Sequence, residues 1–174
     1  MVDEYFGLLT AMLEAAPTHL LQSTLFPTVF QIGFTGLSMD HVRGLSSVIV
    51  FYRRLLGIAL SVDELVPANT TTRSAASIGQ NGARIVEQFR ANGNGFVRLI
   101  FTGLIYHYNW DVISDIASII KSLAQILPLE TSEWVVAVVN EIPEVNLSSQ
   151  NKNEFLTSYM RYTKLEISEI FFFS

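Results

Sequence analysis

The 174-residue sequence contains no cysteine, and charged side chains make up only 16% of it. The absence of cysteine excludes disulfides and every reaction that needs a thiol. Soluble proteins usually carry roughly 25% charged residues, so the low charge is typical of a segment whose ends are covered by more protein. No run of about 18 uncharged apolar residues occurs, because Arg53 and Arg54 interrupt the most hydrophobic stretch, residues 45–60. We therefore expect no membrane-spanning segment and no membrane partner.

Basic residues are scarce as well, and the formal net charge at pH 7 is −5. Nucleic-acid-binding surfaces need a basic stripe that neutralises phosphates, so direct binding of nucleic acid is not expected. An acidic chain is compatible with a basic protein partner. The N-terminal letters MVDEYFGLL begin with acidic residues and lack the basic flank of a secretory signal peptide.

Sequence motifs for catalysis and for metal binding are missing. There is no Gly-x-Ser-x-Gly, no His-Glu-x-x-His and no Asp-rich loop, and His19, His41 and His107 each stand alone in the sequence. The run from Asn92 to Gly95 lacks the preceding strand and the Gly-Lys-Ser/Thr ending of a phosphate-binding loop, so it predicts a helix break. We expect a protein that is not an enzyme, with no catalytic residue, no metal site and no cofactor.

The clearest pattern that is present runs from Trp110 to Pro143 and predicts two helices, each ended by a proline. Pro128 and Pro143 force the residues before them out of helical geometry. Each helix has apolar residues at three- and four-residue spacing, which places them on one face. They are Val112, Ile113, Ile116, Ile119, Ile120, Leu123 and Leu127 in the first helix, and Trp134, Val135, Val138, Val139 and Ile142 in the second. Such a pair needs further pairs stacked beside it, as in a helical solenoid.

Helical periodicity covers most of the remaining chain, and no segment alternates as a strand would. The predicted helices are 3–16, 26–37, 40–60, 78–91 and 96–107, with a closing helix that starts at Ser148 or Ser149. Thr18 is predicted to cap a short connecting turn, and Asp40 is predicted to cap the start of the helix over 40–60. Residues 61–77 have no apolar period and predict a mobile loop.

Together these helices predict an all-α fold, a HEAT/armadillo-like α-solenoid of antiparallel helix pairs. Asp3 to Asp40 and Trp110 to Ser148 are spaced by 37 and 38 residues, close to the roughly 40-residue period of such arrays. We expect about three pairs plus the closing helix in 1–164, followed by a C-terminal tail in 165–174.

Tryptophan, glutamate and arginine side chains are predicted to have structural roles rather than roles at a site. Trp134 is predicted to anchor the core against residues 116–123. Glu130 and Glu133 favour the positive N-terminal end of their helix. Arg84, Arg90 and Arg98 could contact phosphate or acidic groups, but they are predicted to lie on a solvated face.

Four segments of the sequence resemble a known family. The relevant segments are LFPTVFQIGFTGLSMDHVRGLSSVIVFYRRLLGI (from Leu25), NGNGFVRLIFTGLI (from Asn92), ILPLETSEWVVAVVNEIP (from Ile126) and NKNEFLTSYMRY (from Asn151). Their order resembles the C-terminal HEAT repeats of the karyopherin-β superfamily, in particular the transportin-3 and importin-13 branch and its fungal mRNA-transport-regulator members. The matching positions are Phe26, Pro27 and Phe30, then Phe51, Arg53, Arg54, Leu55 and Leu56, then Pro128, Glu130 or Glu133, Trp134 and Pro143, and finally Phe155.

The resemblance implies the C-terminal fragment of a nuclear import receptor that carries protein cargo through the nuclear pore. Its partners would be protein cargoes, Arg/Ser-rich or RNA-binding proteins among them, and it would be found in the nucleus and the cytoplasm. Ran GTPase would bind only through the N-terminal part of such a receptor, which this sequence does not contain. The branch's arginine-rich helix has no match here. The alternative is a generic helical-repeat scaffold or adaptor protein with no tie to nuclear transport.

Candidate contact residues follow from the helix-pair interpretation, because the second helix of a HEAT pair usually lines the concave side. On the helices that begin at Phe96 and Thr131, the positions opposite the apolar stripe include polar side chains. Those predicted to contact cargo, or a neighbouring part of the receptor, are Arg98, Thr102, Glu133 and Asn140.

Overall fold

The computed structural model describes residues 1–39, 42–64 and 72–172. Within these ranges the regular structure is entirely helical, which confirms the predicted all-α class. No helix in them is long and apolar enough to cross a membrane. The helices are α1 (Val2–Ala15), α2 (Pro17–Leu21), α3 (Phe26–Leu37), α4 (Val42–Glu64), α5 (Thr72–Tyr106), the short 3-10 helix η1 (Trp110–Val112), α6 (Ile113–Ile126), α7 (Pro128–Glu141) and α8 (Ser149–Phe172).

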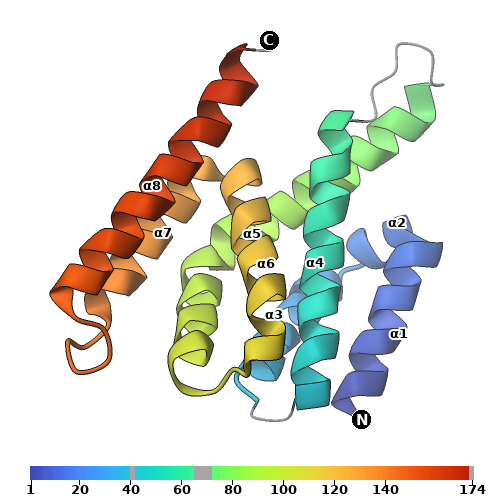
Figure 1. The fold of residues 1–174 in the computed structure, drawn as a ribbon. Coiled ribbons are helices and arrows are strands. Elements are labelled where there is room, and N and C mark those ends of the chain that lie inside the picture. The colour runs from blue at the N-terminus through green and yellow to red at the C-terminus, as the bar shows by residue number, and fades with distance from the viewer. Residues whose placement is uncertain (40–41, 65–71, 173–174) are drawn as a thin grey trace.

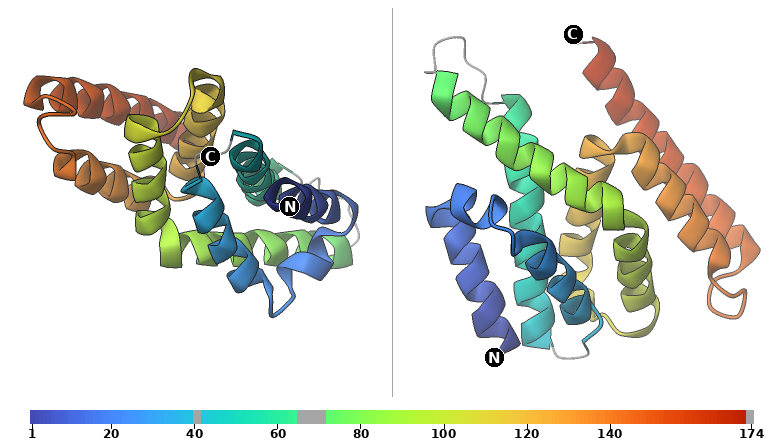
Figure 2. Two further views of the ribbon diagram at one scale, coloured as in Figure 1. Left: turned by 90° about the horizontal axis from the view of Figure 1, so that it is seen from below. Right: turned by 180° about the vertical axis from the view of Figure 1, so that it is seen from behind.

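The helices lie in two layers (Figure 1). In the front layer α4 contacts α1 on one side and α6 on the other. Behind it α5 contacts α2, α3 and α7, and it also packs against α4 (Figure 2). In Figure 1, α1, α4 and α6 run upward whereas α5 and α7 run downward. α4, α5, α6 and α7 therefore follow one another in alternating directions, and α8 closes the fold against α6 and α7.

Proline marks where several helices begin. Pro17, Pro27 and Pro128 each occupy the first or second position of a helix, where the missing N–H costs nothing. The boundary predicted at Pro128 between α6 and α7 is confirmed. The cap predicted for Thr18 is wrong, because the start of α2 has no side-chain cap hydrogen bond. The Thr18 hydroxyl instead accepts a hydrogen bond of 3.0 Å from Asn81 Nδ2 of α5.

α5 is one continuous helix, so the break predicted at Asn92–Gly95 is wrong. The helix changes direction part-way along its length (Figure 2), and glycines within a helix are a common cause of such bends. Gly93 also has a packing role, because the Trp134 ring of α7 lies so close to it that a Cβ atom there would overlap the ring. The glycine serves a contact between two helices and does not end one.

The loop predicted over residues 61–77 is too long at both ends. Residues 61–64 belong to α4 and residues 72–77 to α5, while 65–71 lie outside the described residues, as does Asp40, the predicted cap of α4. Once a helix is packed, each further residue adds a hydrogen bond at little cost. Helices therefore extend into segments that have no apolar stripe of their own.

The helix at the C-terminus is also longer than predicted. The tail predicted to start at residue 165 is helical as far as Phe172, because α8 continues without interruption.

Aromatic rings join α3, α4 and α5 at the centre of the core. The ring of Tyr52 in α4 lies 5.3 Å from that of Phe30 in α3 and 4.7 Å from that of Phe96 in α5, edge-to-face in both cases. Phe89 completes the group at 4.9 Å from Phe30. The Tyr52 hydroxyl donates a hydrogen bond of 2.5 Å to the Phe30 carbonyl, and burial raises the pKa of Tyr52 well above its ordinary value. Each such ring pair contributes about 0.5–1.5 kcal/mol beyond the area it buries.

Gly33 of α3 makes room for Tyr52. A Cβ atom on Gly33 would overlap the phenol ring, whereas a Cβ atom on Gly57, in the exposed face of α4, would meet nothing within 4 Å. Alanine normally stabilises a helix interior by roughly 0.5–1 kcal/mol relative to glycine. The two glycines therefore have opposite expected responses to the same substitution.

We predict that Gly33→Ala lowers the free energy of unfolding by about 1–3 kcal/mol, because overpacking outweighs the gain in helix propensity. Gly57→Ala is the matched control and should raise it by roughly 0.5–1 kcal/mol. Urea unfolding followed by circular dichroism measures both. Equal stabilisation by the two substitutions would show that Tyr52 does not lie against α3.

Trp134 is half-buried at the edge of the core. Its ring lies over α5 at Gly93, whereas the sequence placed it against residues 116–123 of α6. The second tryptophan, Trp110, is 87% exposed, so the two indoles have different environments.

In a Trp110→Phe background, we expect Gly93→Ala to push the Trp134 ring toward water. Its emission should shift to longer wavelength, and acrylamide should quench it more strongly. Gly95→Ala is the control, because its Cβ would meet only Phe34 at an ordinary 3.8 Å. Identical emission spectra for the two alanine variants would contradict the contact.

Candidate functional site

Two arginines of α5 bind acids of α7 along the seam between these helices. Arg90 Nε donates to Glu130 Oε1 at 3.1 Å. Arg98 contacts both carboxylate oxygens of Glu141, with Nη2 at 3.0 Å from Oε1. These arginines, predicted on a solvated face, are indeed partly exposed, but they also connect two helices.

The Arg98–Glu141 pair shifts the pKa values of both side chains. Hydrogen bonding from Arg98 holds the pKa of Glu141 below its ordinary value, and the same bond raises the pKa of Arg98. Glu141 is the last residue of α7, where the negative end of the helix dipole disfavours an acid. Arg98 offsets this repulsion.

The predicted contact residues Arg98, Thr102, Glu133 and Asn140 are all exposed. Arg98 and Thr102 lie one turn apart on α5 and line a small groove of about 130 Å³ beside the end of α7. Glu133 and Asn140 lie on α7 but do not line this groove. The structure thus brings two of the four residues together. Sequence reasoning missed Glu141, which lines the same groove, although an acid in the last turn of a helix signals a nearby cation.

Lys152 fixes the start of α8 against the end of α7. Its ammonium donates to the Asn140 carbonyl at 3.3 Å and to the Ile142 carbonyl. Carbonyls at the end of a helix lack partners within it, and a cation there is favourable. Asn140 therefore contributes its backbone to the packing of α8 while its side chain stays at the surface.

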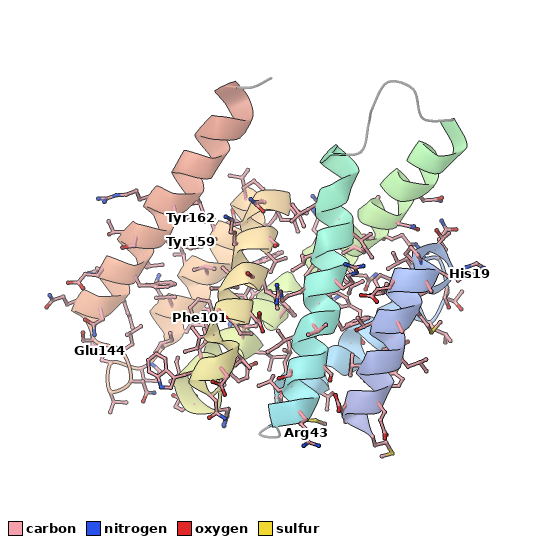
Figure 3. The ribbon with its side chains drawn as sticks, turned by 45° about the vertical axis from the view of Figure 1, so that its right-hand side comes forward. His19, Arg43, Phe101, Glu144, Tyr159 and Tyr162 are labelled. Atoms are coloured by element: carbon pink, nitrogen blue, oxygen red, sulfur yellow. The ribbon has the colours of Figure 1, made fainter. Side chains whose placement is uncertain are left out.

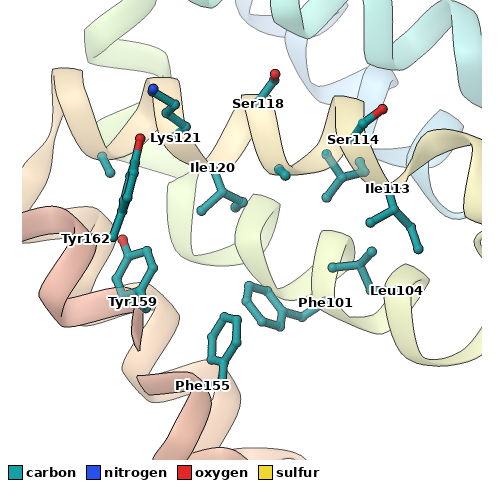
Figure 4. Close-up of a pocket in the computed structure, with 13 residues that line it drawn as sticks. Phe101, Leu104, Ile113, Ser114, Ser118, Ile120, Lys121, Phe155, Tyr159 and Tyr162 are labelled. Carbon is teal, nitrogen blue, oxygen red and sulfur yellow. The ribbon is translucent and has the colours of Figure 1, made fainter. Parts of the chain in front are cut away.

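A larger groove, here called the α6–α8 groove, lies between α6 and α8 with the last part of α5 as its floor (Figure 4). Its volume is about 560 Å³, within the range of roughly 300–1,000 Å³ that ligand pockets occupy. Figure 3 shows where it lies in the whole molecule. It is lined by Phe101, Leu104, Ile113, Ser114, Ile116, Ala117, Ser118, Ile120, Lys121, Ala124, Phe155, Tyr159 and Tyr162.

The aromatic side chains of this groove are ordered by contacts with one another. The Phe101 ring meets the Phe155 ring edge-to-face at 5.8 Å, and Phe155 stacks on Tyr159 at 6.3 Å. Burial raises the pKa of Tyr159, and the neighbouring Ser132 opposes that rise. Tyr159 therefore stays neutral at physiological pH and acts in the groove as a mainly apolar surface.

Lys121 is the charged residue among the described side chains that line the α6–α8 groove. Its ammonium lies 5.6 Å from the centre of the Tyr162 ring, a cation–π arrangement. In the described ranges no three His, Cys, Asp or Glu residues gather as a metal site would require. The described lining is suited to holding apolar groups, and it includes no pair of nucleophile and base.

Sequence reasoning assigned most of these groove residues to core-facing stripes and so missed the groove. The available signal was Phe155 and Tyr162, which remain 41% and 38% exposed although they lie on the apolar side of the closing helix. An apolar stripe that remains partly exposed is a candidate contact surface.

Comparison with known proteins does not place the chain in a family. No family model matches it. It is 20% identical to a Schizosaccharomyces pombe protein named uncharacterized protein C11G11.07, over 93% of this chain and 17% of that protein. The chain thus spans about a sixth of the relative's length, and the relative's name states no function.

Because Arg98 and Glu141 are paired, we predict that the pKa of Glu141 depends on the Arg98 side chain. Carbon-detected NMR should give Glu141 a pKa below that of an unperturbed glutamate, and Arg98→Gln should return it to the ordinary value. Because the folded pKa is the lowered one, the pair contributes stability above the unfolded pKa and loses it as the pH falls through the folded pKa. A Glu141 pKa that Arg98→Gln leaves unchanged would contradict the pairing.

Proposed function

We propose that this chain is the C-terminal HEAT-repeat segment of a nuclear import receptor of the karyopherin-β superfamily, and that it binds protein cargo. The observation that supports the proposal is the two-layer stack of helices that alternate in direction, which is the arrangement expected of the helical repeats that the sequence resembles. In such a solenoid α1, α4 and α6 would form the outer layer. α3, α5 and α7 would form the inner layer.

Two further observations support a role in protein binding. The S. pombe relative is several times longer than the matched part, as expected for a protein built from many helical repeats. The net charge of −5 complements basic cargo such as Arg/Ser-rich proteins, and charge complementarity mainly speeds encounter and selects partners. Ran GTPase would bind through a part of the receptor outside this sequence.

A helical-repeat scaffold or adaptor is the second candidate. The α6–α8 groove favours it, because an apolar groove is suited to binding a protein and this has no necessary tie to passage through the nuclear pore. Both candidates bind proteins through a helical surface. They differ in the effect of depletion, because only the loss of an import receptor lowers the nuclear level of its cargo.

The decisive experiment depletes the complete gene product with a degron and measures the protein composition of isolated nuclei. We expect a defined set of nuclear proteins, rich in basic sequences, to fall in the nuclei and rise in the cytoplasm. The tagged protein itself should shuttle between both compartments. Unchanged nuclear composition, with a tagged protein that stays in one cytoplasmic structure, would favour the scaffold and contradict the receptor.

Complementation of the depleted cells tests whether the α5–α7 seam contacts cargo. The charge swap Arg98→Glu with Glu141→Arg keeps the ion pair but reverses its polarity beside Thr102, so import should fall severalfold. The matched control is Arg90→Glu with Glu130→Arg, which swaps the other pair on the same seam and does not touch the small groove. Equal import by both swapped proteins would remove Arg98 and Thr102 from the cargo surface.

A further inference from the structure

We draw no further inference here: the strongest candidate, the apolar α6–α8 groove, carries none, because nothing in the part of the chain that the structure describes shows what covers it.

Discussion

The close approach of Tyr52 to Gly33 sets the distance between α3 and α4, and the packing of α5 depends on it. The ring contacts Phe30 and Phe96 and thereby joins helices of both layers. The same device recurs along the chain, because side-chain rings lie against Gly93 and Gly103 in α5. At Gly103 the ring is that of Tyr108, whose hydroxyl donates to the Leu37 carbonyl at 3.0 Å, and burial raises the pKa of this tyrosine to about 12.

Polar contacts at the surface follow from this packing. Arg53 and Arg54 are neighbours in α4, and a helix turns by about 100° between successive residues, so they point to different sides. Arg53 pairs with Asp115 of α6, and Arg54 lies 3.6 Å from Glu14 of α1. Exposed pairs of this kind add little stability. The apolar core determines the fold, and the exposed side chains on the seams and grooves remain available for binding.

The sequence predicted the elements whose signals are local. The bounds of α3 and the helix boundary at Pro128 agree with the structure, although α7 begins at Pro128 and not at the predicted Thr131. These signals are local, because proline and apolar spacing act within a few residues. The helix break predicted at Asn92–Gly95 was wrong. Gly93 instead allows the close approach of Trp134, which is distant in sequence.

The candidate sites could be predicted only in part, for the same reason. Arg98 and Thr102 lie together because they are one turn apart on one helix, which the sequence reveals. Their neighbour Glu141 comes from another helix, and the α6–α8 groove needs three helices to meet. Neither the partner of an exposed arginine nor a space between helices can be derived from apolar periodicity.

The central claim is that rings lying over glycines set the helix spacing, and the chemical shifts of the glycine α-protons test it most directly. Protons close to an aromatic face are shifted upfield by its ring current. Gly93 and Gly103, which lie against ring carbons of Trp134 and Tyr108, should show such shifts, whereas Gly7 and Gly57, which have nothing within 4 Å of an added Cβ, should have ordinary values. Ordinary shifts at all four glycines would contradict this account of the fold.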